Sequence, residues 1–142
     1  MTKPIVFERA MSVQYGNLDP YGHVYSPYYL DFVISSRWLY SAERFQLGPN
    51  DFVKADLGFF LTRSEIDYRK PLVGLCEIMV RSHVEVTGET RITVPFAISQ
   101  PANVDHIYAS GVLHLAVVDL KLGRPTPLPE WVKPYFFEAS GG

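Results

Sequence analysis

The order of the predicted elements constrains this fold most, because one long helix comes early and a run of strands follows it. Residues 27–46 are predicted to be helical, since apolar side chains recur there at helical spacing. Ser26 is a residue type that caps helices, Pro27 suits the first helical position, and Gly48 and Pro49 are expected to end the helix. The buried stripe is predicted to contain Leu30, Val33, Ile34, Trp38 and Phe45.

Segments rich in β-branched and aromatic residues flank this helix and are predicted to be strands. The segment Thr87-Gly88-Glu89 between two of them is short enough for a hairpin. Consecutive strands after a single helix indicate an antiparallel sheet with the helix packed on one face. The predicted class is α+β, with one long helix wrapped by a five-stranded antiparallel sheet. The predicted strands are residues 6–15, 59–69, 76–86, 91–99 and 107–120.

Two shorter helices and a terminal tail complete the prediction. Asn50 and Asp51 are expected to cap a short helix that reaches about Leu57, and residues 129–139 are expected to form a small terminal helix. Residues 139–142 are expected to be a flexible tail. A chain of 142 residues without repeats or linkers suits one domain, so residues 1–142 are assigned to a single domain.

Composition and charge exclude several classes of function. The net charge is −2 and the 13 Lys and Arg residues form no basic run, which argues against a nucleic-acid partner. Cys76 is the only cysteine, and a lone thiol fits a reducing compartment. No window reaches the length of a membrane span, so a cytoplasmic protein is expected. The scattered positions of His83, His106 and His114 predict no metal site.

The stretch at residues 15–25 carries the strongest functional signal, and it reads Tyr-Gly-Asn-Leu-Asp-Pro-Tyr-Gly-His-Val-Tyr. It resembles the acyl thioesterases of the hotdog fold, specifically the branch that includes 4-hydroxybenzoyl-CoA thioesterase. The pattern of that branch has an Asp, two residues, Gly-His-Val, and then a Tyr, which Tyr29 supplies here. Residues 65–74 and 119–129 also look similar to this family, so the resemblance covers nearly the whole chain.

The resemblance implies hydrolysis of an acyl-CoA or acyl-carrier-protein thioester to a free acid and a thiol. Asp19 would act either as the nucleophile or as the general base for water, and the residues do not separate these roles. The backbone N–H of Ser26 at the helix start would polarise the thioester carbonyl. Coenzyme A is then part of the substrate, and no cofactor is expected. The implied substrate-binding residues are Gly22, His23, Val24, Tyr25, Tyr29 and Phe60.

The same resemblance implies a homodimer or homotetramer, with sheets joined edge to edge and sites between subunits. Residues 59–62 of one subunit would then contribute to the pocket of the other. Arg37, three turns into the long helix, is interpreted as a surface or interface charge, although the resemblance also extends to hotdog relatives from enediyne biosynthesis that have a functional Arg at the matching site. Candidate contacts with the phosphates of coenzyme A are Arg69, Lys70, Arg81 and Arg91.

Two alternative functions stay open within this fold. Gln14 and Asn17 stand where the family often has an Arg and a second Asp that brace the loop, which keeps a non-catalytic acyl-binding or assembly protein in view. Hotdog enoyl-CoA hydratases have an Asp-x-Asn-Pro-x-His pattern. Here Asp19 precedes Pro20 directly and His23 lies four residues after Asp19, so the spacing and the missing Asn count against a hydratase.

Overall fold

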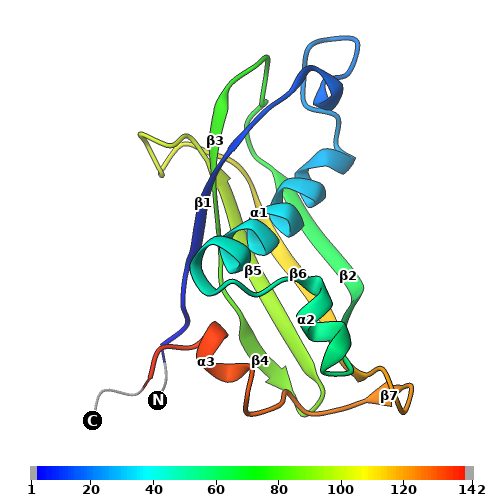
Figure 1. The fold of residues 1–142 in the computed structure, drawn as a ribbon. Coiled ribbons are helices and arrows are strands. Elements are labelled where there is room, and N and C mark those ends of the chain that lie inside the picture. The colour runs from blue at the N-terminus through cyan, green and yellow to red at the C-terminus, as the bar shows by residue number, and fades with distance from the viewer. Residues whose placement is uncertain (1–2, 140–142) are drawn as a thin grey trace.

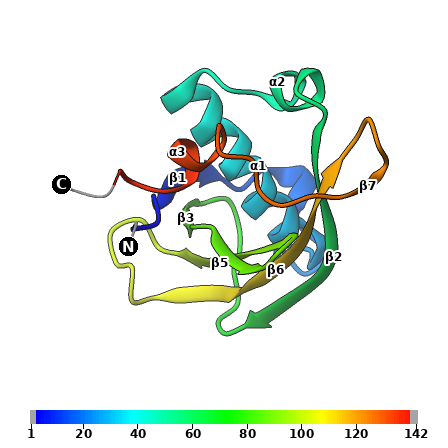
Figure 2. The same cartoon turned by 90° about the horizontal axis from the view of Figure 1, so that it is seen from below.

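A long helix lies across one face of a curled antiparallel sheet in the computed structural model, which describes residues 3–139 (Figure 1). Seen from below, the sheet curves around α1 (Figure 2). The helices are α1 (Pro27–Phe45), α2 (Pro49–Lys54) and α3 (Lys133–Phe136), with a 3-10 turn, η1 (Tyr15–Asn17). The strands are β1 (Phe7–Ser12), β2 (Leu57–Tyr68), β3 (Glu77–Ser82), β4 (Glu85–Gly88), β5 (Arg91–Ser99), β6 (Ile107–Asp119) and β7 (Arg124–Pro125). Among residues 3–139, no helix is long and apolar enough to cross a membrane.

The sheet has the order β1-β3-β5-β6-β2, and every pairing in it is antiparallel. This five-strand path confirms the predicted α+β class. Two short strands join it at its margins, because β4 pairs with β5 and β7 pairs with β6. The twelve-residue strand β2 forms one edge of the sheet.

The strand predicted at residues 76–86 is divided into β3 and β4, and Pro95 explains the division. The backbone N–H of His83 donates to the carbonyl of Pro95 at 3.2 Å, but Pro95 has no N–H to return the bond. The ladder between β3 and β5 therefore stops at Ser82 opposite Phe96, and pairing resumes only at Glu85.

Helix α1 begins and ends almost where the sequence predicts, but its buried face is rotated. Val33 is fully buried as expected, whereas Ile34 is 38% exposed. Leu30, Trp38 and Phe45 are only partly buried against the core. Apolar residues occur around most of the helix, so the pattern alone did not settle which side faces the sheet. The buried residues of α1 are Tyr29, Phe32, Val33, Ser36 and Ser41.

The predicted start of α1 is confirmed, with Ser26 at the N-cap position and Pro27 in the first turn, but the other helix termini differ from the prediction. Ser26 precedes Pro27 at the start of α1, but its side chain makes no capping hydrogen bond. The helix ends at Gln46, which adopts a left-handed conformation with φ of 53°. Gly48 instead caps α2 and donates its N–H to Asp51 Oδ2 at 2.8 Å. The terminal helix is shorter than predicted, and residues 140–142 of the predicted tail lie outside the described residues.

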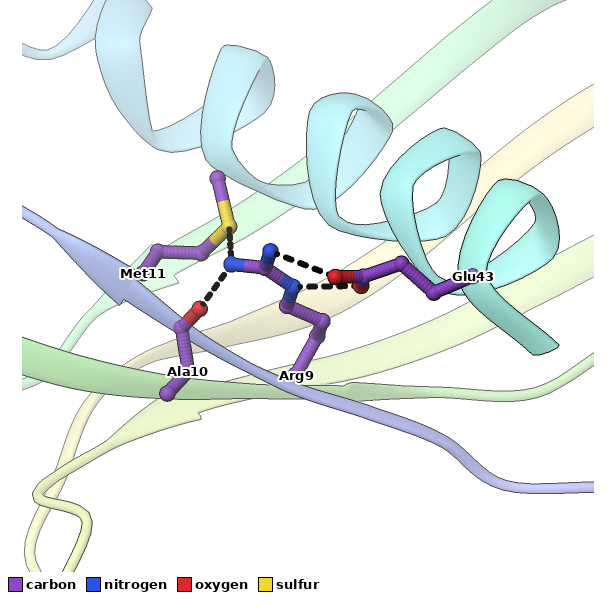
Figure 3. A network of polar contacts seen from close by, with 4 residues as sticks. All are labelled: Arg9, Ala10, Met11 and Glu43. Atoms are coloured by element: carbon purple, nitrogen blue, oxygen red, sulfur yellow. Dashed lines mark hydrogen bonds and ion pairs between the residues drawn. The ribbon is translucent and has the colours of Figure 1, made fainter.

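An ion pair joins the edge strand β1 to α1 (Figure 3). Arg9 donates through Nε to Glu43 Oε1 at 2.9 Å and through Nη2 to Oε2 at 3.1 Å, the forked geometry that guanidinium and carboxylate favour. The hydrogen bond from Arg9 holds the pKa of Glu43 below its usual value. Because both side chains remain partly exposed, the pair fixes the approach of helix to strand more than it stabilises the fold.

Candidate active site

Asp19 is held by a tight turn in the loop between η1 and α1. Its Oδ1 accepts hydrogen bonds from the N–H groups of Tyr21 at 2.9 Å and His23 at 3.0 Å. Its own N–H donates to the carbonyl of His23 at 2.7 Å. Such local bonds from an Asp side chain to the following backbone fix the carboxylate in one orientation. Within residues 3–139, the second oxygen, Oδ2, has no hydrogen-bond partner, so it is available to a ligand.

The loop itself is braced by its neighbours on both sides. Asn17 accepts from the N–H of Tyr25 at 2.8 Å through its carbonyl, and from the N–H of Gln14 at 2.7 Å through its side chain. The buried Val24 donates its N–H to the carbonyl of Leu72 at 2.9 Å. Asn17 therefore braces the loop with an amide where the family often has a carboxylate, and Gln14 takes part through its backbone N–H.

The start of α1 presents a backbone donor beside this loop. Tyr28 donates its N–H to Tyr25 at 2.9 Å and Tyr29 donates to Ser26 at 3.2 Å, while Pro27 has no N–H. No hydrogen bond from the backbone N–H of Ser26 occurs among the described residues. Free N–H groups at a helix start carry partial positive charge, about half an electron in sum, and favour an anionic or polarised oxygen.

Asp19 and Ser26 line the same cavity, whose volume is about 470 Å³. Tyr29 also lines this cavity and meets the ring of Tyr68 edge-on, with ring centroids 4.9 Å apart. Burial raises the pKa of Tyr29 above its ordinary value. Two cationic residues, Arg69 and Lys70, also line the cavity. The other lining residues are His23, Val24, Tyr25, Pro71 and Leu72.

The structure brings together most of the residues selected from the sequence. Six of the eight line this cavity, and Gly22 lies in the loop without lining it. Phe60 lies apart on β2, where it is 53% exposed, so it does not join the others within one chain. Sequence reasoning missed Tyr68, Pro71 and Leu72, which also line the cavity. An isolated antiparallel bridge pairs His23 with Val73, which brings the segment around residue 72 beside the loop. No local sequence pattern predicts such a long-range contact.

The basic residues selected as phosphate contacts divide into two groups. Arg69 and Lys70 line the cavity, and Arg69 Nε also donates to Ser110 Oγ at 2.8 Å. Arg81 pairs with Glu8 on the outer face of the sheet, and Arg91 begins β5, so neither lies at the cavity. No three metal-binding side chains gather among residues 3–139.

Gly22 gives the loop a conformation that other residues strain to adopt, with φ of +79°. We expect Gly22→Ala to lower the rate of any reaction that uses the Asp19 carboxylate by about tenfold or more, because the turn that orients this carboxylate would shift. The left-handed backbone should also cost about 1–2 kcal/mol of folding stability. Gly123→Ala is the matched control, since Gly123 has φ of +67° in the turn between β6 and β7. Strand β7 lies at the opposite end of the molecule from the start of α1 (Figure 1). Equal rate losses in the two variants would contradict this role for Gly22.

Comparisons with known proteins agree with this architecture. A model of the Thioesterase-like superfamily matches residues 13–136, so the chain belongs to this family. Its fold is the hotdog fold of these thioesterases, as the resemblance at residues 15–25 implied. A search of the curated proteins finds no match.

Solved structures of similar fold include several thioesterases. The PA2801 protein from Pseudomonas aeruginosa has a TM-score of 0.76 and 20% identity, covering 92% of this chain and 98% of that one. Slr0204, a 1,4-dihydroxy-2-naphthoyl-CoA thioesterase from Synechocystis, has a TM-score of 0.76 and 21% identity over 90% of this chain and 93% of that one. The SAV2348 protein from Staphylococcus aureus, solved in complex with CoA, has a TM-score of 0.75 and 11% identity over 89% and 78%.

Proposed function

We propose that this chain hydrolyses acyl thioesters of coenzyme A or of an acyl carrier protein. One observation carries the proposal: Asp19 and Ser26 line one cavity, and neither Asp19 Oδ2 nor the backbone N–H of Ser26 has a hydrogen-bond partner among residues 3–139. A thioester carbonyl between them would have a carboxylate on one side and a hydrogen-bond donor on the other. Family membership supports the same reaction class.

Two routes start from this arrangement. As a general base, Asp19 Oδ2 takes a proton from water while the water oxygen attacks the carbonyl carbon. As a nucleophile, Oδ2 attacks that carbon itself and forms a mixed anhydride, which water then hydrolyses. In both routes the carbonyl oxygen gains negative charge and accepts a hydrogen bond from the Ser26 N–H, and the C–S bond then breaks. The leaving sulfur takes its proton from protonated Asp19 in the first route and from water in the second, which gives the free thiol.

Release of thiol from a panel of short, long and aromatic acyl-CoA thioesters tests the proposal. We expect the parent protein to hydrolyse at least one of them. Hydration of an enoyl-CoA without thiol release would instead indicate a hydratase. Binding of acyl-CoA without turnover of any thioester would indicate a non-catalytic acyl-binding protein.

Arg69 and Lys70 are proposed to bind the phosphates of coenzyme A at the mouth of this cavity. A relative of similar fold was solved in complex with CoA, which supports this ligand class. We expect Arg69→Met combined with Lys70→Met to raise KM for acyl-CoA about tenfold or more, since charge-assisted phosphate contacts are lost. The same acyl group on N-acetylcysteamine has no phosphates, and its kcat/KM should stay unchanged. An equal loss on both substrates would show that these residues act on the fold instead.

We also propose that the chain works as a homodimer or homotetramer that pairs along β2. This strand is a long edge of the sheet, and Phe60, Leu61 and Tyr68 on it are 53%, 41% and 54% exposed. An unpaired edge of this length is a liability in a monomer. In such a pair, Phe60 would reach the partner's site. Light scattering should give at least twice the chain mass of 16.1 kDa, and a monomer would contradict the proposal.

A further inference from the structure

A second cavity lies between α1 and the concave face of the sheet, and it is separate from the cavity at Asp19. Its volume is about 180 Å³, and the two cavities share no lining residue. Ile34 and Leu61 line it and are 38% and 41% exposed, so it reaches the surface between α1 and β2. Arg37 lies 11 positions after Ser26 on α1, which is roughly 16 Å along the helix axis.

Arg37 is the single charged residue among the residues that line this second cavity. Arg37 was interpreted as a surface or interface charge. The surface interpretation is wrong, because the side chain lies between the helix and the sheet, and the interface role stays a prediction. Its guanidinium lies over the ring of Phe7, 4.2 Å from the centroid, and Nη1 donates to Ser82 Oγ at 2.9 Å. Burial lowers the pKa of Arg37 to about 10, so the group still carries its charge at neutral pH.

The charge of Arg37 has no counterion in the part of the chain described. No ion pair of residues 3–139 includes Arg37. A guanidinium has five N–H donors, and only the bond to Ser82 uses one of them. Every buried side-chain nitrogen among these residues has a hydrogen-bond partner. The other N–H donors of Arg37 must therefore reach accessible space, and the accessible space beside them is the cavity.

Aromatic side chains form much of the remaining wall. Trp38 and Phe52 meet edge-on at 5.5 Å between ring centroids, and Phe52 meets Phe59 at 5.7 Å. A cavity of about 150 Å³ is known to hold one benzene ring, so a volume of about 180 Å³ suits a single ring with a small substituent. An unpaired cation in such an apolar site favours an anion, because its fork of donors matches a carboxylate.

We propose that this cavity is a binding site for a small apolar carboxylate, with the carboxylate on Arg37 and a ring or compact hydrocarbon against Trp38 and Phe52. The site goes beyond the proposed hydrolysis and does not depend on it. The alternative is that Arg37 only packs against Phe7 and Ser82. The two accounts differ in whether the parent protein prefers an anion to a neutral molecule of the same shape.

Titration with benzoate, benzyl alcohol and acetate tests the site, with Trp38 fluorescence and calorimetry as readouts. We expect saturable binding of benzoate, at least about tenfold tighter than benzyl alcohol, since charge-assisted hydrogen bonds are lost with the alcohol. Acetate has no ring to bury and should bind weakest. Equal affinity for benzoate and benzyl alcohol, or no saturable binding of benzoate, would overturn the proposal. This comparison uses the parent protein and needs no variant to fold.

Arg37→Met keeps an apolar stem over Phe7 and removes the charge. It should weaken benzoate binding about tenfold or more and leave benzyl alcohol binding unchanged. Arg44→Met removes the same charge from an exposed position on the same helix, and it should bind benzoate as the parent does. Asp19→Ala should also bind benzoate normally, so failure of hydrolysis and failure of this site are observed separately. Unchanged benzoate affinity in a folded Arg37→Met variant would contradict the assignment.

Discussion

Replacing Asp19 by Asn should lower the rate of thiol release by a factor of about 100 or more, equivalent to about 2.7 kcal/mol of transition-state stabilisation. The side-chain oxygen of Asn can still accept the N–H groups of Tyr21 and His23, so the turn should persist. What is lost is the negative charge and the proton-accepting ability of Oδ2. The comparison therefore isolates chemistry from loop geometry. Steady-state assays on the best thioester of the panel give the measurement.

Asp19→Ala should lose as much activity and should also loosen the loop, because the two backbone N–H groups lose their acceptor. Asp31→Asn is the matched control, since Asp31 is an exposed carboxylate on α1 that, within residues 3–139, accepts a side-chain hydrogen bond from Ser35 alone. Its activity should equal that of the parent. A rate for Asp19→Asn within a factor of about three of the parent would remove Asp19 from the mechanism.

Gly111→Ala should destabilise the fold by more than about 3 kcal/mol, which lowers the melting temperature by roughly 10 °C for a chain of this size. A Cβ at Gly111 would lie 1.8 Å from the backbone oxygen of Glu65 on β2 and 3.0 Å from the ring of Phe96. The backbone of Glu65 cannot move aside as the flexible end of a side chain can, so the pairing of β6 with β2 would have to open. Chemical denaturation measures the loss directly.

Gly88→Ala is the control for this second prediction. Gly88 also lies in a strand, but a Cβ there would meet only Arg91 Cβ at 3.6 Å, an ordinary contact. Its stability should stay within about 0.5 kcal/mol of the parent, as for most exposed substitutions. If Gly111→Ala unfolds at the same denaturant concentration as Gly88→Ala, the close approach of β6 to β2 is wrong.

Local chemistry explains the parts of this fold that the sequence predicts well. Pro27 fixes the start of α1, and runs of β-branched residues give β5 its predicted limits and β6 limits within one residue. The break between β3 and β4 was missed because its cause, Pro95, lies on the neighbouring strand. Which residues oppose one another in a sheet is a long-range property that periodicity does not carry.

The candidate active site divides in the same way. The carboxylate loop and the helix start are contiguous in the chain, so Asp19 and Ser26 could be selected together from one motif. Tyr68 and Leu72, which line the same cavity, come from a distant segment of the chain and were not predicted as site residues. The burial of Arg37 was not predicted, because its position three turns into the helix does not determine how deeply the side chain lies. Its packing against Phe7, a residue distant in the sequence, does determine this.

A crystal structure with a ketone analogue of an acyl-CoA, in which a methylene group replaces the sulfur, tests the central claim most directly. The account predicts the ketone oxygen at about 2.7–3.1 Å from the backbone nitrogen of Ser26. It also predicts the ketone carbon within about 3.5 Å of Asp19 Oδ2, or one water molecule between them. An analogue bound with its ketone away from the start of α1, or with Asp19 turned to solvent, would contradict the account.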